Sequence, residues 1–172
     1  MQEALLKCVH EVLSATAGTK AEGVYFIGMT VKGSVVHRKI DVVVDADSGV
    51  RIDQCAFLSR RLRERLEEDE EMIGILGDNF DLVVGSPGLG EPIILDRQYG
   101  RHVGRLLRVS YSDLEGVEHE LTGHLLEVSL AEGAGSIMLK PRVEKKKGKG
   151  EELENITLEL GAVLRAVPEA EI

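Results

Sequence analysis

One stretch near the middle of the chain, FDLVVGSPGLGEP at residues 80–92, most constrains how the chain can fold. Its apolar run at 82–84 predicts a β-strand. That strand must end at Pro87, because proline has a fixed φ and no backbone N–H for a ladder. Gly88, directly after the proline, suits the position of a tight turn that requires φ > 0. We therefore expect a structural turn or hinge formed by Ser86, Pro87, Gly88 and Pro92.

This connector separates two halves with different patterns. Before it, periodicity predicts helices at 2–17 and 52–68 and strands at 23–32, 35–45 and 80–85, with the acidic run Glu67–Glu71 as a solvated loop. After it come short strands with glycine turns, at 105–111, 120–130, 136–143, 156–158 and 162–167. We predict an α+β protein: an N-terminal αββαβ domain at residues 1–90 and a small all-β domain, read as an antiparallel barrel, at residues 91–172.

Bulk properties restrict the class of function. The chain has 172 residues and a formal net charge of −9, which argues against loose, non-specific wrapping of nucleic acid but allows a local basic face. Cys8 and Cys55 are far apart on apolar helix faces, so we expect two reduced thiols and no metal site. No signal peptide and no apolar run of about 20 residues is present. We expect a cytoplasmic monomer without membrane contact.

The candidate catalytic and metal-binding motifs lack the residue spacing that such sites require. Ser86 follows a glycine directly and precedes a proline, which does not match a G-x-S-x-G nucleophile elbow. The loop DADSG at 45–49 lacks the glycine and glutamate positions of a calcium-binding EF-hand. No phosphate-binding glycine loop occurs, and no histidine can be grouped with a nucleophile and an acid. We expect no enzyme activity, no cofactor, no metal and no small-molecule substrate.

Three basic clusters favour a binding function. Arginines crowd residues 60–65 and 97–108, and lysines crowd residues 145–149. Arginine recognises phosphate through its bidentate fork, although each cluster alone could equally be a solvated face. The rest of the chain is acidic and could bind a basic protein. Asp45 and Asp47 are our candidates for that contact. The candidate RNA-binding residues are Arg60, Arg61, Arg65, Arg97, Arg101, Lys145 and Lys146.

Ordered motifs resemble the RimP family of ribosome maturation factors over residues 9–168. They are Val44-Asp45, Gly49-Val50, Ile52-Asp53, Cys55-Ala56, Ser59-Arg60, Ser86-Pro87-Gly88-Leu89 and Pro92. The resemblance implies an Sm-like or SH3-like barrel after the α/β domain. It also implies binding to the free small (30S) ribosomal subunit, helping 16S rRNA to fold and a ribosomal protein to be incorporated.

The sequence departs from the family pattern at two positions. Gly90 and Glu91 stand where the family usually has an acid and an arginine, so any RNA contact by that arginine is absent here. An alternative function is an Sm-like RNA-binding or protein-adaptor module that acts away from ribosomes. Sedimentation discriminates the two, because an assembly factor should travel with free small subunits and leave 70S particles bare.

Overall fold

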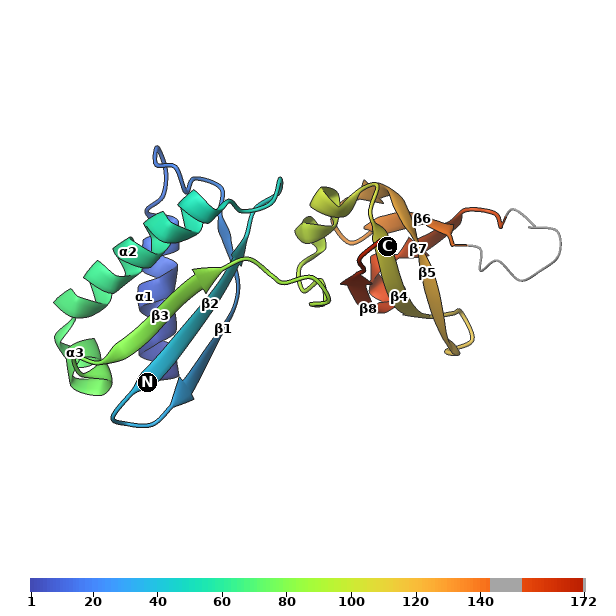
Figure 1. Ribbon diagram of the computed structural model, residues 1–172. Coiled ribbons are helices and arrows are strands. Elements are labelled where there is room, and N and C mark those ends of the chain that lie inside the picture. Colours follow the sequence, from blue (N-terminus) through green and yellow to red (C-terminus); the bar gives the residue numbers. More distant parts are fainter. Residues whose placement is uncertain (143–152, 172) are drawn as a thin grey trace. The chain divides into compact units, whose positions relative to one another are not determined.

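The computed structural model describes residues 1–142 and 153–171. The chain forms two compact units, Met1–Pro87 and Gly88–Ile172, which are taken separately below (Figure 1). Both helices and strands are present, so the predicted α+β class is confirmed. No helix of the described residues is long and apolar enough to cross a membrane.

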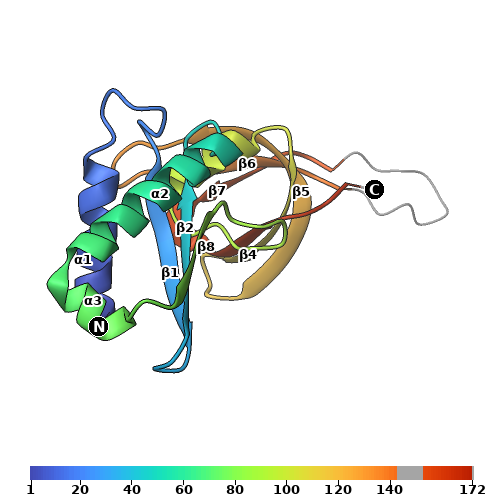
Figure 2. The same ribbon diagram turned by 60° about the vertical axis from the view of Figure 1, so that its left-hand side comes forward.

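The first unit places three helices against a three-stranded sheet of order β1-β2-β3. β1 and β2 are antiparallel, whereas β2 and β3 are parallel and are therefore joined by a helical crossover. Figure 2 shows α1 and α2 on the same face of this sheet. The elements are α1 (Gln2–Ser14), β1 (Tyr25–Gly33), β2 (Arg38–Asp45), α2 (Ile52–Glu68), α3 (Glu70–Leu76) and β3 (Phe80–Gly85).

The core of this unit follows from two periodicities. Side chains alternate across a strand, so Ile40, Val42 and Val44 of β2 all point into the core. The buried face of α2 instead repeats every four residues, at 54, 58, 62 and 66. α2 has the bounds predicted for it, but Cys55, which was expected on its apolar face, lies one position after the buried Gln54 and is only half-buried.

The acidic run after α2 was expected to be a solvated loop, and this is wrong. Asp69 interrupts it and caps a further helix, α3, by accepting a hydrogen bond from the backbone N–H of Met72 at 3.1 Å. Acidic residues suit this position because a helix N-terminus carries partial positive charge. Met72 and Leu76 then bury their side chains in the core. The order of elements is therefore αββααβ rather than αββαβ.

Two further boundaries differ from the prediction. The first helix ends at Ser14, three residues before the predicted end. The second strand starts at Arg38 rather than residue 35, because a loop closes first with a 3.0 Å hydrogen bond from the backbone N–H of Ser34 to the carbonyl of His37. The two valines inside that loop, Val35 and Val36, are exposed.

The second unit contains a single five-stranded sheet of order β7-β6-β5-β4-β8, in which every neighbouring pair is antiparallel. Its buried centre includes Leu107, Val109, Leu125 and Ile137. Each strand starts within two residues of its predicted start. The elements are η1 (Asp96–His102), β4 (Leu106–Ser112), β5 (Glu118–Ser129), β6 (Ser136–Pro141), β7 (Ile156–Glu159), η2 (Leu160–Ala162) and β8 (Val163–Pro168).

This sheet is strongly rolled, and the argument comes from its two edge strands. In a flat sheet with strands about 4.8 Å apart, β7 and β8 would lie about 19 Å from each other. Glu159 and Val163, at the facing ends of β7 and β8, are joined by η2 alone and can be at most about 14 Å apart. The edges must therefore approach each other. No strand pairing among the described residues joins them, so the closed barrel that we predicted is not formed.

The turn in the connector is displaced from its predicted place. Gly88 does not have a positive φ; Gly90 does, at 87°. The backbone N–H of Glu91 donates to the carbonyl of Gly88 at 3.1 Å, so Gly90 is the third residue of the turn, where a type II turn needs φ > 0. Pro87 therefore precedes the turn, and Gly90, three residues after it, adopts the left-handed conformation.

Candidate nucleic-acid interface

The arginines of α2 are mostly neutralised within the first unit. Arg61 lies 3.9 Å from Glu64, and Arg63 lies 3.6 Å from Glu67. The guanidinium of Arg63 also lies 4.7 Å from the ring centroid of Phe80. Pairs of this exposed kind contribute little to stability, yet they reduce the positive charge that α2 presents to a polyanion.

Arg65 holds three helices together. Its Nη2 lies 2.8 Å from Glu11 of α1, and its Nη1 lies 3.0 Å from Asp69, the residue that caps α3. Hydrogen bonds to Glu11 and Asp69 raise the pKa of the guanidinium, and the pKa of the Asp69 carboxyl is lowered, first by the N–H of Met72 and then by Arg65. The structure thus gives this predicted RNA contact an internal role.

The cations of α2 that remain directed outward are Arg60 and Arg61. Arg60 is exposed and forms no ion pair within the part of the chain that the structure describes. Arg61 packs over the ring of Phe57 at 5.3 Å, and its side chain stays 58% exposed. A stacked arginine loses less conformational freedom on binding, because its fork is already positioned. Both side chains are thus accessible on the surface of α2.

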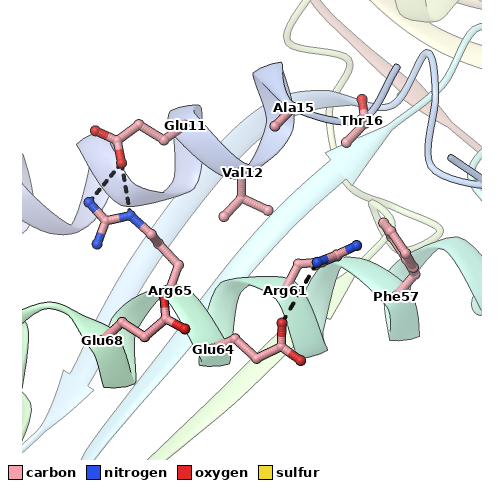
Figure 3. Close-up of a pocket in the computed structure, with 9 residues that line it drawn as sticks. All are labelled: Glu11, Val12, Ala15, Thr16, Phe57, Arg61, Glu64, Arg65 and Glu68. Atoms are coloured by element: carbon pink, nitrogen blue, oxygen red, sulfur yellow. Dashed lines mark hydrogen bonds and ion pairs between the residues drawn. The ribbon is translucent and has the colours of Figure 1, made fainter. Parts of the chain in front are cut away.

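A groove of about 370 Å³ runs between α1 and α2 (Figure 3). Val12, Ala15 and Phe57 form its apolar part. Its charged groups are three carboxylates and two guanidiniums, and the close-up shows Glu11 bonded to Arg65 across it. The lining contains one hydroxyl group, that of Thr16, and no cysteine, serine or histidine.

In the second unit, the predicted cations belong to one 3-10 helix, η1. Arg97 is exposed and Arg101 is half-buried, and both interact with other groups of the chain. Arg97 also lines a hollow of about 600 Å³ together with the acids Asp96, Glu132 and Glu159. This hollow is thus acidic on balance, which does not favour phosphate. Lys145 and Lys146 lie outside the described residues.

The two aspartates predicted to contact a basic protein lie in different environments. Asp45 is buried, with no exposed surface, and its Oδ1 accepts a hydrogen bond from the backbone N–H of Ala46 at 2.9 Å. It offers no surface to a partner, so its predicted contact is corrected here. Alternation places Asp45 on the opposite face from the core-facing residues of β2, so the strand pattern alone does not predict its burial. Asp47 is exposed.

Two histidines pair with carboxylates, one in each unit. His37 lies 2.9 Å from Asp81 in the first unit, and His119 lies 2.7 Å from Asp113 in the second. The hydrogen bond to Asp81 raises the pKa of His37. Among the described residues, no group of three or more potential metal ligands occurs. Each of these pairs is a single surface ion pair.

Sequence reasoning missed one basic surface, the hairpin between β1 and β2. Lys32 and Lys39 are seven residues apart in the sequence, but the register of the two strands places them directly opposite each other. Arg38 lies beside them, opposite Gly33. The available signal was the turn at Gly33-Ser34, which folds the cations of both strands together.

Comparison with known proteins identifies the family. Residues 15–90 match the family model described as the RimP N-terminal domain. A protein of Chlorobium luteolum named "Ribosome maturation factor RimP" is 70% identical over 164 residues, covering 95% of this chain and 93% of that protein. The chain belongs to the RimP family. A RimP protein of Pelodictyon phaeoclathratiforme is 53% identical over the full length of both chains, and one of Cytophaga hutchinsonii is 33% identical over 136 residues, 78% of this chain and 75% of that protein.

Membership of the RimP family confirms the resemblance found in the sequence. Gly90 and Glu91, where the sequence was expected to depart from the family pattern, both belong to the turn of the connector. Gly90 takes φ = 87° here, a conformation that a side chain makes costly, and Glu91 closes the turn through its backbone N–H. The connector of this RimP protein therefore has a glycine turn and no arginine.

Proposed function

We propose that this chain binds the free small (30S) ribosomal subunit and assists its assembly, helping 16S rRNA to fold and a ribosomal protein to be incorporated. One observation carries the proposal: relatives that are 53% to 70% identical over at least 95% of this chain are named ribosome maturation factor RimP. Identity of this extent covers both units, so the role of these relatives is proposed for the whole chain.

The mechanism we propose is selective binding without covalent chemistry. A protein that binds one arrangement of a flexible RNA better than the others shifts the population toward that arrangement. The relatives of this chain are named maturation factors, and the proposal accordingly includes no catalytic step. The chain acts in the cytoplasm as a monomer and needs no cofactor.

The contacts follow the charges that remain accessible. Arg60 and Arg61 meet rRNA phosphates from α2, and Asp47 meets a basic ribosomal protein. The turn at 86–92 connects the two units as a hinge. The rolled sheet of the second unit supports the Sm-like or SH3-like architecture that the family resemblance implies, although its edge strands stay unpaired.

Sedimentation of cell extracts tests this function. We expect the tagged full-length chain to travel with free small subunits on a sucrose gradient and to be absent from 70S particles. Its absence from small subunits in cells and with purified subunits at every salt concentration would overturn the proposal. Co-sedimentation only with non-ribosomal protein or RNA would instead support the adaptor function.

The salt dependence of binding then tests the contacts. Each phosphate neutralised by a cation contributes about 0.7–0.9 to the slope of log affinity against log salt. The double variant Arg60→Gln/Arg61→Gln should lower this slope by up to about 1.8 if both residues touch phosphate. Arg63→Gln is the matched control, because Arg63 is occupied by Glu67 and by the ring of Phe80. An unchanged slope in the double variant would remove α2 from the RNA contact.

A further inference from the structure

We propose that the β1–β2 hairpin, defined as residues 32–39, binds the phosphate backbone of small-subunit ribosomal RNA, with its two tip valines against the sugar and base surface. This inference rests on the proposed function and names an RNA-contacting element within it. The hairpin shares no residue with the arginine cluster of α2. Four observations about its geometry, charge and exposure carry the inference.

The hairpin has a defined shape before any partner binds. Gly33 has φ = 96°, and a Cβ built there would lie 2.3 Å from the carbonyl oxygen of His37. That carbonyl accepts the hydrogen bond from the N–H of Ser34. The chain therefore crosses itself closely at Gly33, where only glycine fits. A preformed tip loses little conformational freedom on binding, which favours recognition of a partner by this element.

The charges of the hairpin are arranged unfavourably for the free protein. Lys32 and Lys39 are cross-strand partners, and like charges directly opposite each other destabilise a sheet. Lys32 has no ion pair with any residue that the structure describes, and the amine of Lys39 comes only within 3.9 Å of Asp41. An external polyanion placed over the two lysines would relieve their repulsion more than the long contact between Lys39 and Asp41 does.

Arg38 adds a third permanent charge. It forms no ion pair with the described residues, and its buried Nε–H has no hydrogen-bond acceptor among them. An unsatisfied buried donor is costly, and this one belongs to a residue type that suits phosphate. Arg38 is half-buried next to the loop of the hairpin, so its charge can add to the local positive potential there.

Two carboxylates lie close to the hairpin and limit this potential. Asp81 bonds to His37 at 2.9 Å, and its position on β3 is opposite Lys39 in the sheet. Asp41 is the second. Lys32, Arg38 and Lys39 bring three permanent positive charges together on this hairpin, and His37 adds to them whenever it is protonated. This is a local concentration of positive charge in a chain whose net charge is −9.

The tip of the hairpin is apolar. Val35 is 79% exposed and Val36 is 81% exposed, so two adjacent branched side chains project into solvent. RNA presents both surfaces that this hairpin fits: a charged backbone for the lysines, and sugars and splayed bases for an apolar side chain. An acidic protein surface would satisfy the lysines equally, so the nature of the partner is what the experiment must decide.

The experiment compares full-length variants on two probes, purified free small subunits and protein-free small-subunit rRNA, at several salt concentrations. Lys32→Gln/Lys39→Gln removes the facing charges, and Lys7→Gln/Lys20→Gln is the control with two exposed lysines elsewhere in the same unit. On both probes the hairpin variant should lower the salt slope by about 1.4–1.8, as for two lost phosphate contacts. The control should leave the slope unchanged.

The valines need their own variant. Val35→Ser/Val36→Ser should weaken binding to both probes without changing the salt slope, because no phosphate contact is lost. Leu114→Ser is the control, since Leu114 is a fully exposed apolar residue of the second unit. Melting curves should show every variant folded, because all the substituted side chains are exposed.

Each outcome has one reading. If wild type binds small subunits and the hairpin variants match their controls, the hairpin proposal is overturned and the proposed function stands. If the lysine variant loses affinity for subunits but keeps its affinity and slope on protein-free rRNA, the partner is a protein and the proposal is also overturned. If wild type binds no subunits, the proposed function fails, and the slope on protein-free rRNA still decides whether the hairpin binds RNA.

Discussion

The guanidinium of Arg65 lies 2.8 Å from the carboxylate of Glu11 and so connects α2 to α1. The same guanidinium reaches Asp69, the residue that caps α3, at 3.0 Å. One side chain thus links all three helices of the first unit. The arginines of α2 therefore fall into two groups, one that organises the unit and one, at Arg60 and Arg61, that faces outward.

The first prediction separates these two groups. We expect Arg65→Gln to lower the melting temperature of the full-length chain's first unit by about 2–5 °C, because both helix contacts are lost. Arg60→Gln should leave the melting temperature unchanged, since Arg60 has no ion pair with the described residues. Differential scanning calorimetry measures both. Equal melting temperatures for Arg65→Gln and wild type would show that the three-helix contact is not stabilising.

A second prediction concerns acid. The pKa of Asp69 is lowered, so its carboxylate is favoured in the folded state. A depressed pKa stabilises the fold above the unfolded value of about 3.9, and the stabilisation is lost as pH falls through the folded pKa. Asp69→Asn should therefore melt at a lower temperature than wild type at pH 7, and the difference should shrink toward zero near pH 2. A difference that stays constant with pH would contradict the assignment.

The third prediction tests the displaced turn. Gly90→Ala should destabilise the second unit by about 1–2 kcal/mol, because a side chain at φ = 87° is strained. Gly88→Ala is the matched control, because Gly88 does not have a positive φ. A Cβ added at Gly88 would lie 3.8 Å from the side chain of Glu91, which is an ordinary van der Waals distance. Urea unfolding compares the two. If Gly88→Ala lowered the unfolding free energy more than Gly90→Ala, the strained turn position would be Gly88, as predicted from the sequence.

The fourth prediction concerns the two units as separate folds. Fragments 1–87 and 88–172 should each fold, because each has its own buried cluster. A cut between residues 90 and 91 should weaken the second fragment, because it removes Gly88 and with it the hydrogen bond to Glu91. Circular dichroism and amide exchange test this. Two unfolded fragments would contradict the division.

The last prediction concerns a close approach of two strands. A Cβ at Gly123 on β5 would lie 2.6 Å from the backbone oxygen of Lys140 on β6. Gly123→Ala should force the strands apart and cost about 1–3 kcal/mol. Gly161→Ala, at a position with open space and no positive φ, should change the unfolding free energy little. If the two variants have equal unfolding free energies, β5 and β6 can move apart at Gly123 without loss of stability.

Local pattern alone determined much of this protein. The bounds of α2 and β3 were predicted without error, because a continuous helical period and a run ended by Pro87 depend only on neighbouring residues. Family membership was also readable from the ordered motifs, above all Ser86-Pro87-Gly88-Leu89. The cap at Asp69 was readable in principle, since an acid before Met72 and Leu76 is a helix start, but the charged run around it concealed the signal.

Other properties were decided only by the tertiary structure, because they depend on residues far apart in the chain. Arg65 meets Glu11 across 54 positions, which changes a candidate RNA contact into a link between helices. Asp45 loses all its exposure to the fold around it, although its place at a strand end suggested a surface residue. Lys32 and Lys39 become a pair only through the register of β1 and β2. Periodicity reports which face a side chain takes, whereas its partner and exposure are set by the packing of distant segments.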